Sequence, residues 1–265
     1  SLIEFSGQDR LQWLQGQVTQ NLTGLESGET RALCICEPTG QILAIGRVTE
    51  TDGSTWMEVP SDCVEALLNR VEEMVVMEDV VANDVTANWH FTSRHGAHAM
   101  LKNVRPAIVL RHDRFGMEGF DIWSRTPIEH DDLLPNRADE FAGVRLEHGI
   151  PKWPDDFPPK LLPPELGAGF LETHVSFSKG CYVGQEVLMR IHSRGHTNRT
   201  WVVLESELDL AVGDPVAAEG GDAVGFVTSV GRSKNGLFLA GAFIRNAALE
   251  GRLVIAGTSV RVRLR

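Results

Sequence analysis

An α+β fold that ends in a small β-barrel is predicted by a change of pattern along this chain of 265 residues. Up to about residue 198, stretches with helical spacing of apolar residues alternate with short, β-branched, strand-like stretches. From Thr200 onwards only strand-like stretches remain, separated by turn signals, of which Asn235-Gly236 is the clearest for a hairpin. Short strands at close spacing are typical of a small barrel, so we place a boundary near Asn198 and the barrel in residues 199–265.

The composition argues against two broad classes of partner. The formal net charge is −11, from 36 acidic and 25 basic residues. We therefore expect no direct nucleic-acid binding and no membrane binding, and no run of 18 apolar residues predicts a membrane span. The densest basic patch, whose simpler interpretation is a solvated face, consists of Arg190, His192, Arg194, His196 and Arg199.

The four cysteines show no pairing framework. Free thiols indicate a reducing compartment, so we expect a cytoplasmic location, or the mitochondrial matrix if the source is eukaryotic. Cys34 and Cys36 would share one face of a strand, and without further ligands we interpret them as core residues.

The first helix is predicted near the N-terminus. Ser6 can cap it, and Asp9 lies in its first turn, where negative charge is favourable. Gly16 is a candidate break. The apolar stripe of this helix would consist of Leu11, Leu14, Val18 and Leu22.

Strands and turns dominate the next stretch. Two strands around a turn at Pro38–Gly40 are predicted within Arg31–Val48, and Ala107–Arg111 is another strand. His95 and His98 could both bind a metal ion, but the sequence offers no convincing third ligand, so we expect no metal site.

A helix is predicted over Phe141–His148, ending at Gly149. Its Arg145 and Glu147 lie two residues apart and do not face each other. From the residues alone, two solvated charges are the simpler interpretation. The proline-rich stretch Pro151–Pro164 follows and predicts an extended loop.

One stretch, Phe177–Gly195, concentrates chemically special residues. Lys179 places a cation two residues before the thiol of Cys181. A helix is predicted from Tyr182, so Cys181 would lie near a helix N-terminus, where backbone N–H groups favour a thiolate. The alternative is a half-buried small hydrophobe, and the local pattern leaves both open. Two glycines would supply backbone conformations that other residues resist: Gly180 and Gly184.

This stretch resembles the signature of the YgfZ-type folate-binding proteins, a branch of the aminomethyltransferase (glycine cleavage T protein) superfamily. That signature reads Lys-Gly-Cys-Tyr/Phe-x-Gly-Gln-Glu, and it is complete here from Lys179 to Glu186. The segments Gly7–Asn21, Arg145–Gly149 and Pro164-Glu165 are also similar to the family. The resemblance covers nearly the whole chain, and its main motif is far more specific than a lone glycine motif.

The resemblance implies a ring of three modules around a central tetrahydrofolate cavity, built from antiparallel sheets with packed helices and a ferredoxin-like part. The first two modules would interleave within residues 1–198. Glu147 would receive the pterin ring, because a carboxylate can accept hydrogen bonds from the pterin amino group and the adjacent ring N–H. Cys181 would be the leading chemical group, with Lys179 beside it. Further cofactor-binding candidates are Arg145, Gln17, Thr19, Glu165 and Gln185.

The function implied by the resemblance is an accessory one. The protein, a monomer, would bind tetrahydrofolate or a one-carbon derivative and support iron–sulfur cluster assembly or repair and tRNA-modifying radical enzymes. Its partners would be iron–sulfur proteins or their assembly machinery. One alternative is a folate-dependent aminomethyltransferase or demethylase, and another is a scaffold that has lost its ligand.

One departure from the superfamily bears on these alternatives. By approximate alignment, Ala66 stands where true aminomethyltransferases carry a catalytic aspartate, and Ala44-Ile45 replaces an Asp-Asp pair. Ordinary aminomethyl transfer is therefore not expected.

Overall fold

The computed structural model describes residues 1–51, 53–96, 107–112, 114–128 and 138–264. His98, one half of the histidine pair considered above, lies outside the described residues. The chain divides into two compact units, Ser1–Leu133 with Glu172–Met189 and Leu134–Leu171 with Arg190–Arg265. The interleaved modules predicted within residues 1–198 stay a prediction.

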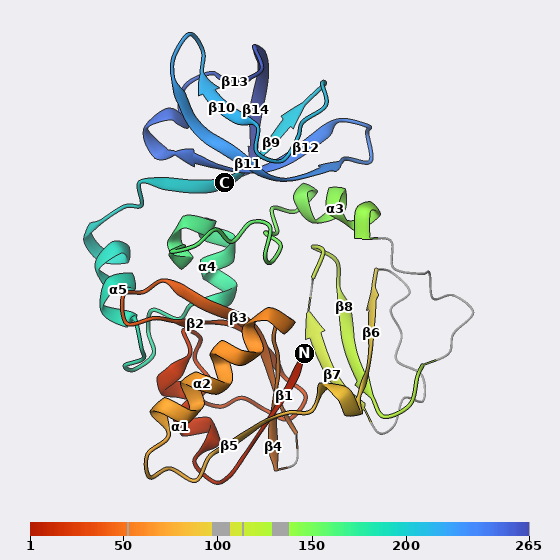
Figure 1. The fold of residues 1–265 in the computed structure, drawn as a ribbon, viewed down its shortest axis with the longest axis vertical. Coiled ribbons are helices and arrows are strands. Elements are labelled where there is room, and N and C mark those ends of the chain that lie inside the picture. Colours follow the sequence, from red (N-terminus) through yellow and green to blue (C-terminus); the bar gives the residue numbers. More distant parts are fainter. Residues whose placement is uncertain (52, 97–106, 113, 129–137, 265) are drawn as a thin grey trace. The chain divides into compact units, whose positions relative to one another are not determined.

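A five-stranded antiparallel sheet is the main sheet of the first unit (Figure 1). Its order, β2-β3-β4-β1-β5, places the N-terminal strand between β4 and β5. The predicted turn at Pro38–Gly40 is confirmed, because β2 and β3 pair around it and the Gly40 N–H donates to the carbonyl of Glu37 at 2.8 Å. The strands are β1 (Leu2–Ser6), β2 (Thr30–Cys36), β3 (Ile42–Thr51), β4 (Ser54–Glu58) and β5 (Val81–Asp84).

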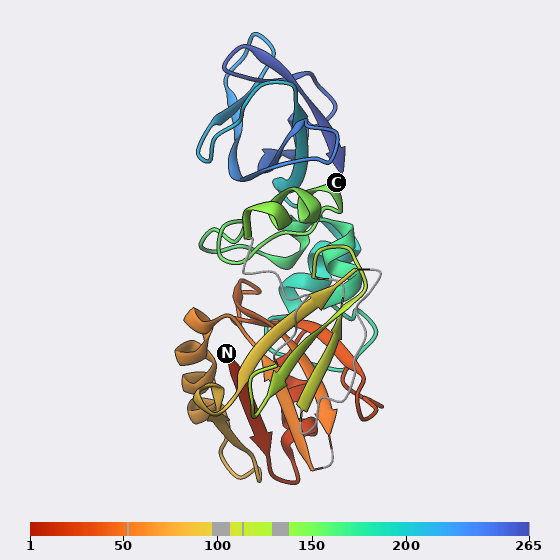
Figure 2. The same ribbon diagram turned by 90° about the vertical axis from the view of Figure 1, so that its right-hand side faces the viewer.

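Helix α2 (Val64–Met74) covers one face of this sheet (Figures 1 and 2). It follows a short 3₁₀ turn, η1 (Ser61–Cys63). Its apolar residues recur at helical spacing, and Leu67 and Val71 are buried. The helix therefore contributes its apolar face to the core of the first unit.

The first helix is shorter than predicted. Helix α1 spans Arg10–Gln17, and Val18 is already extended, with φ −108° and ψ 157°, and forms a β-bridge with Ile35. The prediction that the apolar stripe of the helix continues through Val18 and Leu22 is therefore wrong, because both residues follow the end of the helix. The N-cap is Asp9, and its carboxylate accepts the Asp79 N–H at 2.8 Å instead of capping the helix.

A second, three-stranded antiparallel sheet has the order β6-β8-β7. Its register places Gly119 of β8 opposite both His95 of β6 and His112 of β7. Asp121 lies two residues further along β8, on the same face. The strands are β6 (His90–His95), β7 (Ala107–His112) and β8 (Gly119–Ser124), and the 3₁₀ turn η2 (Thr86–Asn88) precedes them.

Six strands of the second unit form a closed barrel, as predicted (Figures 1 and 2). Its strand order is β10-β11-β12-β9-β14-β13. The predicted hairpin joins β11 and β12, where Gly236 has a φ of +84°. The strands are β9 (Arg199–Ser206), β10 (Pro215–Ala218), β11 (Ala223–Arg232), β12 (Phe238–Arg245), β13 (Leu253–Ile255) and β14 (Thr258–Leu264), with the 3₁₀ turn η4 (Asn246–Ala248).

Helix α3 (Ala138–Glu147) packs closely on the barrel within the second unit. A Cβ added at Gly143 would lie 1.7 Å from the carbonyl oxygen of Arg232 on β11, so only glycine permits this approach. The α+β class and the small C-terminal barrel are thus confirmed.

The remaining helices are short. They are η3 (Pro163–Leu166), α4 (Ala168–His174) and α5 (Gln185–Arg194). Within the described ranges, we find no helix with the length and apolar character that a membrane crossing requires.

Candidate functional site

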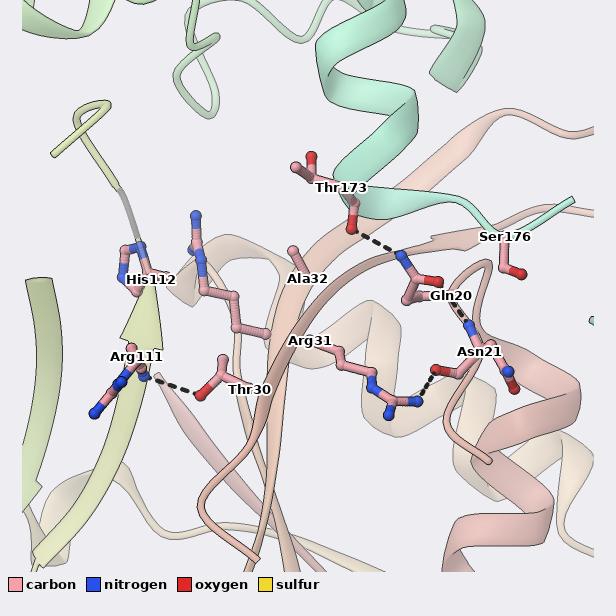
Figure 3. Close-up of a pocket in the computed structure, with 10 residues that line it drawn as sticks. Gln20, Asn21, Thr30, Arg31, Ala32, Arg111, His112, Thr173 and Ser176 are labelled. Atoms are coloured by element: carbon pink, nitrogen blue, oxygen red, sulfur yellow. Dashed lines mark hydrogen bonds between the residues drawn. The ribbon is translucent and has the colours of Figure 1, made fainter. Parts of the chain in front are cut away.

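A cavity of about 550 Å³ lies in the first unit (Figure 3). Its walls come from the segment after α1, from strands β2, β3 and β7, and from the chain around the end of α4. The lining residues are Gln20, Asn21, Thr30, Arg31, Ala32, Arg47, Arg111, His112, Thr173 and Ser176.

The lining is cationic. Three of the ten lining residues are arginines, Arg31, Arg47 and Arg111, and none of the ten is an aspartate or glutamate. The Arg31 side chain is held in place, since it donates to the carbonyl of Asn21 at 2.6 Å and pairs with Glu29 at 2.8 Å. Such a lining suits a ligand that carries negative charge.

Hydrogen bonds join the walls of this cavity (Figure 3). Gln20 donates from Nε2 to the carbonyl of Thr173 at 2.9 Å. The backbone N–H of Arg111 donates to Oγ1 of Thr30 at 2.9 Å, and this hydrogen bond links β7 to β2. Hydrogen bonds therefore connect the segments that form the cavity walls.

Lys179 holds the wall that follows α1. Its Nζ donates to three main-chain carbonyls, those of Gln15 at 2.6 Å, Val18 at 2.7 Å and Gln20 at 2.8 Å. An ammonium has three N–H donors, so these bonds saturate it. Burial lowers the pKa of Lys179 to about 7.

The segment around Lys179 also pairs with the opening segment through its backbone. The Ser176 N–H donates to the carbonyl of Thr19 at 3.0 Å, and the Val183 N–H donates to that of Gly16 at 3.1 Å. Two stretches that are far apart in the chain thus form one local structure beside the cavity.

Comparison with known proteins agrees with the signature. No family model matches the chain. It is 23% identical over 266 residues to the tRNA-modifying protein YgfZ of Aliivibrio fischeri, covering 93% of this chain and 83% of that protein. It is 25% identical over 209 residues to an uncharacterized protein of Haemophilus influenzae, covering 77% of this chain and 70% of that protein.

The fold matches a solved structure, the glycine cleavage system aminomethyltransferase T of Bartonella henselae, with a TM-score of 0.73 at 15% identity, over 98% of this chain and 81% of that one. The chain is thus similar in sequence to a YgfZ protein, and it has the fold of an aminomethyltransferase.

The cysteine of the Lys179–Glu186 signature is accessible. Cys181 is exposed, whereas Cys34, Cys36 and Cys63 are buried. Burial raises the pKa of Cys36 and of Cys63 to about 12, so both stay protonated at neutral pH. Helix α5 begins at Gln185 rather than at the predicted Tyr182.

The other candidates in the first unit contact the protein itself. The Thr19 hydroxyl donates to the carbonyl of His174 at 2.6 Å and accepts from the Cys34 N–H at 2.8 Å. Gln185 donates to the carbonyl of Gly180 at 3.3 Å. Gln17 is buried, and its Oε1 has no hydrogen-bond partner among the described residues. Ligand binding by these three residues stays a prediction.

Three candidates lie in the second unit, where they make internal bonds. Arg145 is buried and pairs with Asp156 at 2.9 Å. Glu147 accepts the Lys234 N–H at 2.8 Å through Oε1. Glu165 accepts from Arg199 Nε at 2.9 Å. The pterin-binding role of Glu147 stays a prediction.

A buried polar cluster in the first unit was not predicted. Asp121 accepts from His112 and from the guanidinium of Arg114, and Arg114 also contacts Glu58. Burial lowers the pKa of His112 to about 4, although its bond to Asp121 acts in the opposite direction. Burial by itself would raise the pKa of Asp121, but hydrogen bonds from His112 and His95 and the charge of Arg114 hold it well below its usual range.

Only the strand register brings this cluster together. His95, His112 and Asp121 lie on three different strands, and a glycine, Gly119, separates the two histidines across the sheet. The alternation of side chains along each strand indicates which residues share a face, but it does not indicate which strands are neighbours in the sheet.

Proposed function

We propose that the protein binds tetrahydrofolate or a one-carbon derivative in the cavity of the first unit. The observation that carries this proposal is the arginine-lined cavity beside the signature segment. Its volume lies within the usual range for small-molecule sites. Folates end in glutamate carboxylates, which arginine side chains bind with charge-assisted hydrogen bonds.

Arg111 is the residue we assign to those carboxylates. It lines the cavity and is exposed, and its guanidinium lies 5.3 Å from the Phe120 ring centre. A contact with a ring face does not use the N–H groups of the guanidinium. Loss of a charged hydrogen bond costs about 1.5–3 kcal/mol. The signature residue Lys179 would act indirectly, by positioning the wall that carries Gln20 and Asn21.

We further propose that the bound folate serves an accessory role rather than turnover. By approximate alignment, Ala44, Ile45 and Ala66 stand where the superfamily has carboxylates. None of the ten described lining residues is an acid that could act as a general base. The exposed thiol of Cys181 would then contact a partner, for which we propose iron–sulfur proteins or their assembly machinery, including tRNA-modifying enzymes.

Two assays test the accessory role. Purified protein mixed with tetrahydrofolate and a methylated amine should show no one-carbon transfer. Cells lacking the protein should lose iron–sulfur enzyme activity, and the wild-type gene should restore it while the Arg111→Ala and Cys181→Ala variants should not. Measurable turnover would favour the transferase alternative, and unchanged iron–sulfur enzyme activity would rule out the accessory role.

The pterin position needs a separate test, because Glu147 comes from the family resemblance. If Glu147 anchors the pterin, Glu147→Ala should abolish tetrahydrofolate binding, measured by calorimetry. A variant that binds as tightly as wild type would remove Glu147 from the site without affecting the assignment of Arg111.

A further inference from the structure

We propose that His95, His112 and Asp121 bind a divalent first-row transition metal ion. The three side chains converge from β6, β7 and β8 on one face of the three-stranded sheet. Two imidazoles and one carboxylate are a ligand set that suits Zn²⁺, Fe²⁺, Mn²⁺ or Co²⁺.

Gly119 makes this convergence possible. It lies between the two histidines across the sheet, and a Cβ at this position would lie 2.1 Å from Nδ1 of His95. Because Gly119 has no side chain, the His95 ring occupies that space, and the ring centres of His95 and His112 lie 5.3 Å apart. Any larger residue would push His95 away from Asp121.

The spacing of the ligand atoms is close to that of a coordinated ion. One ligand atom from each of the three residues lies within 4.8 Å of the others. Nε2 of His95 lies 3.5 Å from Oδ1 of Asp121. Metal bonds of about 2.0 Å in a tetrahedron separate two ligand atoms by about 3.3 Å. His112 hydrogen-bonds Asp121 directly, so its ring needs a small shift outwards to admit the ion.

The hydrogen bonding of the cluster is incomplete. The side chains of His95, His112 and Asp121 are 3%, 8% and 0% exposed. Among the described residues, Nδ1 of His95 and Nδ1 of His112 are both buried without a hydrogen-bond partner. In both rings the nitrogen that faces Asp121 is Nε2, so the ion would bind at Nε2, and the unpartnered Nδ1 atoms do not themselves mark its position.

The surroundings provide a competitor and an entrance. The Ser93 hydroxyl lies 2.8 Å from Nε2 of His95 and donates to Oδ1 of Asp121, so it must turn away for the ion to contact both atoms. His112 lines the cavity, so an ion can reach the cluster from that side.

Arg114 competes with a metal ion for the carboxylate of Asp121. Its guanidinium contacts Asp121 and Glu58 together, and it occupies the carboxylate oxygen that also accepts from His112. Metal binding would leave Arg114 on Glu58 alone. Removing the positive charge at residue 114 should therefore strengthen metal binding.

Titration of metal-free protein with Co²⁺, followed by the visible absorption of the bound ion, tests the proposal. Wild type should bind one Co²⁺, which Zn²⁺ displaces. His112→Ala and Asp121→Asn should bind at least about tenfold more weakly. The control His196→Ala, at an exposed histidine of the second unit, should bind like wild type.

Arg114→Gln separates metal binding from folding, since misfolding cannot tighten binding. We expect at least about a tenfold gain in affinity for this variant. X-ray absorption of the Co²⁺ complex should show two imidazole ligands. Absence of binding to wild type, binding that survives His112→Ala and Asp121→Asn, or a spectrum without imidazole ligands would each overturn the proposal.

Discussion

At the scale of single residues, Lys179 shows how a signature residue can act through structure. The residue is 8% exposed, and its ammonium donates to three main-chain carbonyls of the segment that forms one cavity wall. These carbonyls belong to residues up to 164 positions away in the chain. A positive charge two residues before the signature cysteine therefore holds the protein backbone.

Lys179→Met should destabilise the protein by about 2–4 kcal/mol, because three buried or partly buried main-chain carbonyls would lose their donor. Arginine should not restore the loss, since a planar guanidinium cannot reproduce three converging donors. Urea unfolding measures the effect. Lys152→Met is the matched control at an exposed lysine and should change the free energy of unfolding by less than about 0.5 kcal/mol. Equal losses in both variants would contradict the role of Lys179.

Tyr182 gives a direct pH prediction, because it is the protein's single tyrosine. Burial raises the pKa of its hydroxyl well above the ordinary value. A raised pKa in an acidic group means that the unfolded state loses its proton first, so stability falls as pH rises above 10. Tyrosinate absorbance should therefore stay absent in native protein at pH 11 and appear on unfolding.

The same titration in concentrated guanidinium chloride supplies the control and should show the ordinary tyrosine midpoint near 10. A native midpoint equal to the unfolded one would show that the Tyr182 hydroxyl is not buried.

At the scale of elements, the two signature glycines differ. Gly184 has a φ of +86°, and a Cβ added there would lie 2.7 Å from the carbonyl oxygen of Glu37. Gly180 has open space around its Cβ position, and its φ lies outside the left-handed region. The expectation that both glycines supply special conformations is therefore wrong for Gly180. Gly184 also explains why α5 begins at Gln185, since a residue at φ +86° cannot belong to a right-handed helix.

Gly184→Ala should therefore destabilise the protein by at least about 1–2 kcal/mol, through backbone strain and the contact with Glu37. Gly180→Ala, the matched control in the same loop, should be near neutral. Thermal unfolding of the two variants measures the difference. Similar shifts in melting temperature would contradict the conformational distinction between them.

At the scale of the whole molecule, local signals were predictable and distant pairings were not. The barrel is predictable because each of its turns is signalled by residues that are adjacent in the sequence, such as Asn235-Gly236. The cluster of His95, His112 and Asp121 was missed because it depends on the order β6-β8-β7, which no local pattern contains.

Side-chain direction was equally hidden from the sequence. The spacing of Arg145 and Glu147 predicts only that they diverge. In the structure, the buried Arg145 forms a salt bridge with Asp156, and Glu147 accepts a hydrogen bond from the Lys234 backbone N–H. Both partners lie outside the helix, so helical spacing cannot identify them. The signature segment was recognised from sequence, but the role of Lys179 required the three-dimensional contacts.

Calorimetric titration of tetrahydrofolate into wild type and Arg111→Ala tests the central claim most directly. Arg252→Ala is the control, since that side chain is 81% exposed on the second unit. We predict binding to wild type and to the control, and at least about tenfold weaker binding to Arg111→Ala, the equivalent of about 1.4 kcal/mol. No binding to wild type would contradict the proposed function, and equal affinity in all three proteins would show that the ligand binds elsewhere than in this cavity.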